Sequence, residues 1–337
     1  MNHNRGELCL VPCNSGIDFA QKVLDEINKK RKKEVSLLDT EEVRYANTEI
    51  KGILNESIRG KDVFIIQDVE NHSDGKSVDD NLRTLYTIIG ACKRCDANHI
   101  TAVIPSFPYA RQDKQWGRED ITAARVAWEL EGDLGANHII TIDLHNPAIQ
   151  GFFRCAQIEN LHGSHVLMPH VLNSIENPKD VIIIPTDLGG AKRANFYARC
   201  LESDVGFVYK TRDYKSANTI KDIQIMGDLK DKVVYIIDDM IDTAGSLCKV
   251  IKVAKKNGAK EIICIATFGL LNNSAIDKLH ECYREKSLNK LILTDAAYIP
   301  NKILRRYSWI EIVSVAEYFA EIIHRLNKRK SIGELLY

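Results

Sequence analysis

The chain has 337 residues, with 46 Lys plus Arg balanced by 46 Asp plus Glu, so its formal net charge is zero. This length suits roughly two domains, and the balanced charge argues against a nucleic-acid partner. No apolar run approaches the roughly 18 residues of a membrane span, so we expect no membrane contact. The start, MNHNRGELCLVPCNSG, lacks a charged and then apolar leader. We therefore expect a cytoplasmic protein with reduced cysteines.

Short runs rich in valine and isoleucine alternate with longer amphipathic stretches along the chain. The runs predicted to be strands are, in chain order, 62–67, 99–106, 138–143, 180–185, 206–210, 233–238, 261–268, 290–295 and 310–315. The stretches predicted to be helices are 81–97, 122–134, 247–256 and 315–326, with a short last helix after the capping-box spacing at 331–334. Apolar strands that alternate with helices predict parallel sheets covered on both faces.

The least periodic connection runs over residues 154–163. There we place the boundary between an N-terminal domain, 1–158, and a C-terminal domain, 159–337. It stays open whether the last helix packs on the first domain. In open α/β sheets, ligands sit at the carboxyl ends of strands, so the residues that follow the predicted strands are the candidates for a site.

One predicted strand runs into a loop rich in Thr, Gly and Ser, within VVYIIDDMIDTAGSL at 233–247. Backbone N–H groups of such a loop, at the start of a helix, can bind a phosphate group. The hydroxyls of Thr243 and Ser246 would add donors, and Gly245 would let the backbone approach the ligand closely. The segment therefore predicts a phosphate site.

Two adjacent carboxylates, Asp238 and Asp239, stand at the end of that strand. Burying them there would be costly without a ligand or an ion. Ionised carboxylates only accept hydrogen bonds, so the pair suits the vicinal hydroxyls of a sugar. It equally suits a hydrated Mg²⁺ ion, and the residues alone leave both possibilities open.

The acidic loop resembles the phosphoribosyl pyrophosphate (PRPP) loop of the phosphoribosyltransferase fold, which hosts both PRPP users and the enzymes that make PRPP. Four further segments resemble the ribose-phosphate diphosphokinase family, also called PRPP synthetases. They are PSFPYARQDK at 105–114, TIDLHNPAIQGFF at 141–153, PTDLGG at 185–190 and IMGD at 225–228. The resemblance runs in the family's order from about Leu8 to Tyr337.

The resemblance implies an α/β protein of two phosphoribosyltransferase-like domains, each a mainly parallel sheet flanked by helices. The first would carry the segments that contact ATP, and the second the loop for ribose 5-phosphate. The implied reaction transfers the diphosphoryl group of ATP to O1 of ribose 5-phosphate, giving PRPP and AMP for nucleotide biosynthesis. Mg²⁺ is the implied cofactor, and self-association from dimers to hexamers is the implied assembly.

The resemblance also implies roles for the matched residues. Those for ribose 5-phosphate are Asp238, Asp239, Asp242, Thr243, Ala244, Gly245 and Ser246. Those for ATP are Arg111 and Gln112 and, reaching from a neighbouring subunit, Tyr45, Asn47 and Glu49. The implied metal contacts are His145 and Asp187. Lys210 and Arg212 match a catalytic pair at the base of a mobile loop, where two cations would neutralise the charge that develops during transfer.

Two other classes of protein remain open at this point. A catalytically silent relative could bind and regulate an active synthetase, although the retained Lys210, Arg212 and acidic loop favour the enzyme. A PRPP-using transferase or PRPP-sensing regulator would need no ATP half-site, and the ARQD and DLH segments speak against it. The assembly, the preferred nucleotide donor, and any response to phosphate or ADP also stay open. The effect of the atypical loop at 213–220 on loop closure stays open, as does the effect of the insertion at 71–79.

Overall fold

The computed structural model of the protein describes residues 5–212 and 220–336. Its contacts divide the chain into two compact units. The first unit comprises the chain up to Gly163, Ala296–Tyr298 and the chain from Ser314, while the second comprises Ser164–Asp295 and Ile299–Val313. The division into domains 1–158 and 159–337 stays a prediction. No helix in the described part of the chain is long and apolar enough to span a membrane.

The first unit is built on a five-stranded parallel sheet in the order β1-β4-β5-β6-β7. Its strands are β1 (Leu8–Pro12), β4 (Asp62–Ile66), β5 (His99–Val103), β6 (His138–Ile142) and β7 (Gln157–Leu161). Every residue of β1, β4 and β6 is buried, because the sheet is covered on both faces. All carboxyl ends of these strands therefore lie at one edge, and all amino ends at the other.

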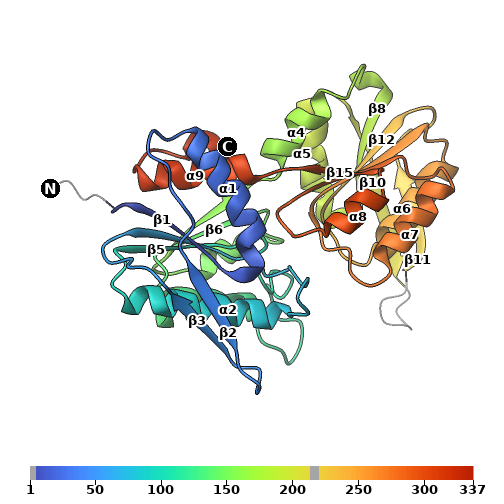
Figure 1. The fold of residues 1–337 in the computed structure, drawn as a ribbon. Coiled ribbons are helices and arrows are strands. Elements are labelled where there is room, and N and C mark those ends of the chain that lie inside the picture. The colour runs from blue at the N-terminus through green and yellow to red at the C-terminus, as the bar shows by residue number, and fades with distance from the viewer. Residues whose placement is uncertain (1–4, 213–219, 337) are drawn as a thin grey trace. The chain divides into compact units, whose positions relative to one another are not determined.

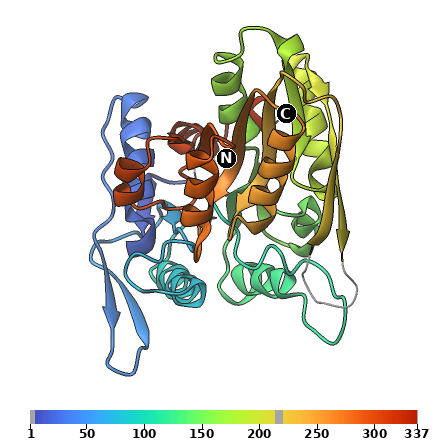
Figure 2. The same cartoon turned by 90° about the vertical axis from the view of Figure 1, so that its right-hand side faces the viewer.

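Helices and one hairpin complete the first unit. They are α1 (Ile17–Lys29), α2 (Val78–Arg94), α3 (Thr122–Trp128), α9 (Ala316–Asn327), α10 (Gly333–Leu336) and the antiparallel pair β2 (Thr40–Arg44) and β3 (Ile50–Leu54). Ser77 and Asp80 form a reciprocal capping box that starts α2. Helix α9 packs on α1, with the rings of Phe19 and Phe319 edge-to-face at 5.2 Å. In both views the β2–β3 hairpin projects from this unit (Figure 1, Figure 2).

The second unit is built on a six-stranded parallel sheet in the order β15-β14-β13-β12-β8-β9. Its strands are β8 (Val181–Pro185), β9 (Asp204–Val205), β12 (Val233–Ile241), β13 (Glu261–Gly269), β14 (Lys290–Thr294) and β15 (Ile310–Val313). An antiparallel ribbon of β10 (Phe207–Arg212) and β11 (Ile220–Met226) accompanies the sheet.

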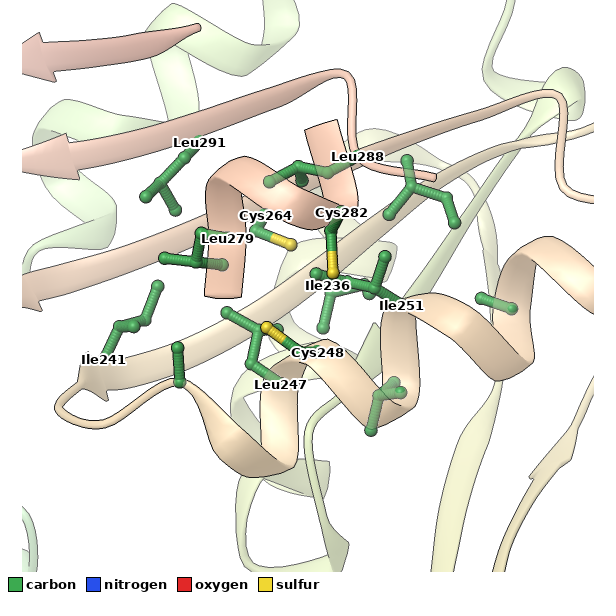
Figure 3. Close-up of a cluster of buried hydrophobic side chains, with 14 of the residues drawn as sticks. Ile236, Ile241, Leu247, Cys248, Ile251, Cys264, Leu279, Cys282, Leu288 and Leu291 are labelled. Carbon is green, nitrogen blue, oxygen red and sulfur yellow. The ribbon is translucent and has the colours of Figure 1, made fainter. Parts of the chain in front are cut away.

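The faces of the second sheet are covered by α4 (Ser164–Leu172), α5 (Ala191–Leu201), α6 (Gly245–Lys256) and α7 (Ala275–Arg284), and α8 (Asn301–Arg306) precedes β15. Side chains alternate along β12 between two cores. Val234 and Ile236 pack with α6 and α7, whereas Tyr235 and Ile237 pack with α4 and α5. Figure 3 shows the first of these cores, in which Cys248 of α6 and Cys282 of α7 lie among aliphatic side chains. All nine cysteines are free thiols.

The nine predicted strands and the four longer predicted helices are all present, and the prediction of mainly parallel sheets is confirmed. One interpretation was wrong. Residues 154–163, expected to be a connection, contain β7, an edge strand of the first sheet. Its sequence QIENL carries only Ile158 and Leu161 as apolar residues. An edge strand needs less apolar surface than a central strand. β7 therefore lacks the apolar run by which the other strands were predicted.

Replacing Phe319 by alanine is expected to lower the free energy of unfolding by about 3 to 5 kcal/mol, because its fully buried ring lies between α1 and α9. Denaturant unfolding would measure the change. Phe196→Ala is the matched control, because that ring is 49% exposed and its loss should change stability by about 0.5 kcal/mol or less. Equal stability of the two variants would contradict the packing of α9 on α1.

Candidate active site

The predicted phosphate loop lies at the carboxyl edge of the second sheet, where β12 ends and α6 begins. The neighbouring strand β8 ends at the same edge, since Ile237 of β12 pairs with Pro185 of β8. The Thr186 hydroxyl, directly after β8, donates to Asp238 Oδ2 at 2.6 Å. The structure therefore brings the turn that holds Asp187 next to the two carboxylates at the end of β12.

Asp238 and Asp239 are both largely withdrawn from water, and Asp239 is only 7% exposed. The Asp239 N–H donates to Asp238 Oδ1 at 2.9 Å, so the two carboxylates are held close to each other. Burial raises the pKa of Asp238, and the adjacent Asp239 raises it further, against a lowering by the Thr186 hydroxyl. Arg193 of α5 is the nearby cation, with Nη1 at 3.8 Å from Asp239 Oδ1. Such a pair favours a ligand that brings hydroxyl donors or a cation.

The loop after these carboxylates is tied down from α7 and the segment before it. Asn272 Nδ2 donates to Asp242 Oδ1 at 3.0 Å, and Lys278 Nζ donates to the Thr243 carbonyl at 3.1 Å. Ala244 has a left-handed φ of 57° and acts as the N-cap of α6. These contacts fix the loop while its hydroxyl side chain at Thr243 stays exposed.

The first turn of α6 offers open space above the backbone. A Cβ placed on Gly245 would meet no atom within 4 Å, and Ser246 is exposed beside it. The first N–H groups of a helix have no partner inside the helix, and the helix dipole favours negative charge there. The 12-residue α6 therefore presents an anion-binding end next to the carboxylates.

Asp187 caps a short 3₁₀ turn, Leu188–Gly190, that leads into α5. Its side chain accepts from the Gly189 N–H at 3.0 Å, and its carbonyl accepts from the Gly190 N–H at 3.1 Å. The carboxylate is exposed, on the same sheet edge as Asp238.

Lys210 and Arg212 lie in the last residues of β10. In the antiparallel ribbon Lys210 is opposite Ile223 and Arg212 is opposite Ile220, with a register shift between Thr211 and Arg212. Val208 and Ile223 of this ribbon are buried in the core that also holds Ile184 of β8. The ribbon backbone is thus anchored to the sheet up to these two residues. The predicted mobile segment after Arg212 lies, at 213–219, outside the described residues.

In the first unit, the predicted ATP and metal residues follow the carboxyl ends of β5 and β6. Gln112 accepts from the Thr122 hydroxyl at 2.5 Å, which joins its turn to α3. The turn with Arg111 and Gln112 is also joined to the segment with His145, because Asn146 Nδ2 donates to Asp113 Oδ2 at 2.5 Å. The structure therefore brings these two predicted segments together at one sheet edge.

Tyr45, Asn47 and Glu49 lie together at the tip of the β2–β3 hairpin. The Tyr45 N–H donates to the Glu49 carbonyl at 2.9 Å, and the Glu49 N–H donates to Asn47 Oδ1 at 3.2 Å. Tyr45 is 48% exposed, so its ring is available for stacking. Tyr45 and Glu49 also line a cavity of about 700 Å³ in their own unit. Tyr109, shortly before Arg111 in the chain, also lines this cavity, but Arg111 and Gln112 do not.

Some of the oxygen donors in this site suit a metal ion. In residues 5–212 and 220–336, no three His, Cys, Asp or Glu side chains gather as a metal site. The paired carboxylates Asp238 and Asp239, with the raised pKa of Asp238, nevertheless fit a hard cation with oxygen ligands. His145 belongs to the first unit and Asp187 to the second.

Three residues that contact this site were not predicted from the sequence. Arg193, Asn272 and Lys278 reach the acidic loop from helices or turns that come before and after it in the chain. Only Arg193 had a sequence signal, because it follows the Gly189–Gly190 turn by one helical turn. The other two could not be found without the fold.

The raised pKa of Asp238 predicts a pH-dependent stability. In the folded chain Asp238 keeps its proton to a higher pH than in the unfolded chain, so above the ordinary carboxyl range the folded state binds more protons. The free energy of unfolding should therefore fall as the pH rises from about 4 towards neutrality. In denaturant titrations at several pH values, Asp238→Asn should reduce the fall of the free energy of unfolding with rising pH. Asp231→Asn, at an exposed position, should leave this fall unchanged. Identical pH slopes for Asp238→Asn and the parent would contradict the assignment.

Family models match both halves of the chain. A model of the "N-terminal domain of ribose phosphate pyrophosphokinase" matches residues 8–132, and one of the "Phosphoribosyl synthetase-associated domain" matches residues 210–337. Among curated relatives, ribose-phosphate pyrophosphokinase 2 of Schizosaccharomyces pombe is 37% identical over 327 residues, which is 96% of this chain and 95% of the relative. The ribose-phosphate pyrophosphokinase of Clostridium acetobutylicum is 33% identical over 336 residues, 99% of this chain and 98% of the relative.

A solved structure matches over nearly the whole chain. The crystal structure of phosphoribosylpyrophosphate synthetase from Mycobacterium smegmatis aligns with a TM-score of 0.84 at 29% identity. It covers 96% of this chain and 99% of that one. The similarity therefore extends over both units and includes the segments that carry the predicted site.

Proposed function

The chain belongs to the ribose-phosphate pyrophosphokinase family and makes phosphoribosyl pyrophosphate, and we propose here how its own residues perform the reaction. The reaction transfers the β,γ-diphosphoryl group of ATP to O1 of ribose 5-phosphate and releases AMP. A catalytically silent regulatory relative is not favoured, because relatives that match 87% to 99% of the chain carry the enzyme's name.

The observation that best supports a ribose 5-phosphate site is the junction of β12 and α6. Two adjacent carboxylates, a hydroxyl-bearing loop and a helix N-terminus follow one another within residues 238–246. In this proposal Asp238 and Asp239 accept hydrogen bonds from the ribose hydroxyls. The 5-phosphate binds the N–H groups and hydroxyls of Thr243, Ala244, Gly245 and Ser246, with Asp242 held beside it by Asn272.

ATP is proposed to bind Arg111 and Gln112, because a guanidinium gives charge-assisted hydrogen bonds to phosphate oxygens. The adenine would stack on Tyr45 of a neighbouring subunit, while Asn47 and Glu49 would bind its polar edge. The exposed ring and the projecting hairpin support this arrangement (Figure 2). It requires self-association, which we propose as dimers that assemble into hexamers.

Lys210 and Arg212 are the proposed catalytic residues. As O1 of ribose attacks the β-phosphorus, negative charge grows on the β-phosphoryl oxygens and on the oxygen that leaves with AMP. Two cations placed there stabilise the transition state more than the bound substrates. Positioning and electrostatics carry most of the rate in phosphoryl transfer. Both residues lie at the end of β10, whose backbone pairs with β11. This pairing supports a fixed position for their backbone.

Mg²⁺ is the proposed metal, with His145 and Asp187 as its protein contacts. When bound, it would neutralise charge on the phosphate oxygens. Asp187 is exposed at the carboxyl edge of the second sheet, which also carries Asp238. This position supports Asp187 as a contact of the metal. A cytoplasmic location and the lack of a nucleic-acid partner stay predictions.

AMP release by the purified protein with ATP and Mg²⁺ tests the proposal. We expect AMP only when ribose 5-phosphate is present. AMP at the same rate without the sugar phosphate would contradict the assignment of the acidic loop, because water would then be the acceptor. Binding of both ligands without any AMP would favour the silent relative instead.

A further inference from the structure

The β2–β3 hairpin, which carries Tyr45, Asn47 and Glu49 at its tip, has little apolar surface of its own to fix it. No residue of strands 40–44 and 50–54 is buried. A two-stranded hairpin without further support is only marginally stable in water. The position of its tip therefore depends on the contacts that each strand makes with the rest of the first unit.

Strand β3 is held by close packing on α2. A Cβ placed on Gly52 would lie only 2.4 Å from Cδ1 of Ile88, a fully buried residue of α2, so the backbone of β3 packs directly against this helix (Figure 1). In the antiparallel register Glu42 of β2 is opposite Gly52. The hairpin is therefore held at one level along its length, through β3 by Gly52 and through β2 by Glu42.

Glu42 holds β2 through both oxygens of its carboxylate. Its Oε1 accepts from the Asn14 N–H at 2.6 Å, and its Oε2 accepts from Lys76 Nζ at 2.8 Å. The side chain of Glu42 is only 5% exposed and that of Lys76 only 12%. A buried ion pair holds a defined geometry when its remaining hydrogen-bonding groups also have partners, and the Asn14 N–H meets this condition for Glu42.

Lys76 belongs to the 71–79 loop, which is itself fixed to the unit. The buried Asn71 donates through Nδ2 to the Ser15 carbonyl at 2.8 Å, and its own carbonyl accepts from Asn81 Nδ2 at 2.9 Å. His72 Nδ1 donates to the Lys76 carbonyl at 2.8 Å, and the capping box of α2 follows directly. The backbone of Lys76 is therefore held from both sides.

We propose that Lys76 is a positioning residue, which through Glu42 holds the β2–β3 hairpin so that its tip can bind the adenine of ATP. This inference rests on the proposed contact between the hairpin tip and ATP. Glu42 precedes Tyr45 by three residues, which is roughly 10 Å along a strand. A small rotation of β2 at Glu42 would displace the Tyr45 ring, and a displacement of about 1 Å at a positioning group can cost up to about 100-fold.

Lys76→Met tests this proposal, because it keeps an unbranched side chain and removes the cation. Glu42 would then be buried without its ion-pair partner and would turn towards water, which would release β2. We expect the KM for ATP to rise about tenfold. The kcat and the KM for ribose 5-phosphate should stay within about twofold of the parent, because the hairpin contacts only the nucleotide. Steady-state AMP formation with each substrate varied in turn measures all three constants.

Three further variants serve as controls. Lys76→Arg keeps the cation and should keep the KM for ATP near the parent value. Lys29→Met breaks an ion pair with Glu26 at 2.6 Å in which Lys29 is 66% exposed, and it should change none of the constants. Glu42→Gln keeps an acceptor for the Asn14 N–H without the charge. It should raise the KM for ATP about threefold, and it tests the proposal even if Lys76→Met does not fold.

Tyr45→Ala separates the positioning role from the ATP contact itself. This variant removes the proposed stacking ring and should raise the KM for ATP about tenfold. In the Tyr45→Ala background, Lys76→Met should raise the KM by only about threefold, because two changes that act through the same contact are not additive. A full additional tenfold rise would contradict a role of Lys76 that acts through the hairpin tip.

Two other results would overturn the proposal. They are an unchanged KM for ATP in both Lys76→Met and Glu42→Gln, and a rise in the KM for ribose 5-phosphate as large as that for ATP, which would indicate a general loss of structure. If Tyr45→Ala alone raises the KM for ATP, only the positioning role is contradicted. If Tyr45→Ala leaves the KM for ATP unchanged, the proposed ATP contact of the hairpin fails and the positioning role fails with it.

Discussion

Lys210→Ala is expected to lower kcat by about 100-fold to 1,000-fold while the KM for ribose 5-phosphate changes little. The reason is that the cation acts where charge grows in the transition state, and much less on the bound sugar phosphate. Its backbone lies in a ribbon anchored by Val208 and Ile223, so the substitution should leave the core intact. Steady-state kinetics with ribose 5-phosphate as the varied substrate would measure both constants.

Lys256→Ala is the matched control for this experiment. Lys256 is exposed at the far end of α6, in the same unit but a full helix away from the phosphate loop. Its removal should leave kcat and KM at the parent values. An unchanged kcat in Lys210→Ala would remove Lys210 from the catalytic machinery, and a rise in KM without loss of kcat would make it a binding residue.

Thr243→Ala and Asp242→Ala are expected to raise the KM for ribose 5-phosphate by about 10-fold to 100-fold, with a smaller effect on kcat. A hydrogen bond to a charged phosphate contributes about 1.5 to 3 kcal/mol, and Thr243 would supply one. Asp242→Ala would also release Asn272, which holds the loop from outside. The KM for ATP should stay close to the parent value, because ATP is assigned to the first unit.

The conservative variant Thr243→Ser distinguishes a lost hydroxyl from a disturbed loop. Serine keeps the donor, and the Lys278 contact to the backbone carbonyl of residue 243 does not depend on the side chain. Its KM should therefore remain near that of the parent. If Thr243→Ala leaves the KM for ribose 5-phosphate unchanged, the loop binds something other than the 5-phosphate.

The central strands could be predicted because burial on both faces requires an almost continuous apolar sequence. DVFII of β4 and VIIIP of β8 are fully buried and read in this way. The hairpin strands β2 and β3 and the edge strand β7 carry polar residues on exposed faces. Their pairing depends on partners elsewhere in the chain, which a local pattern does not contain.

In the candidate site, too, a local sequence pattern does not contain the partners that lie elsewhere in the chain. Its acidic loop is contiguous, so Asp238 to Ser246 could be identified from residue order and from the resemblance to a known family. The supports of that loop are not contiguous. Arg193, Asn272 and Lys278 reach it through side-chain contacts that exist only after β12, α5 and α7 are packed.

Phosphorus NMR of the reaction mixture would identify which phosphoryl group is transferred and which bond forms. With ATP, Mg²⁺ and ribose 5-phosphate, we expect AMP together with a diphosphoryl group on O1 of the sugar, whose two phosphorus signals are coupled to each other. ADP together with a sugar that has gained a single phosphate would contradict it, because that product requires transfer of the γ-phosphoryl group alone.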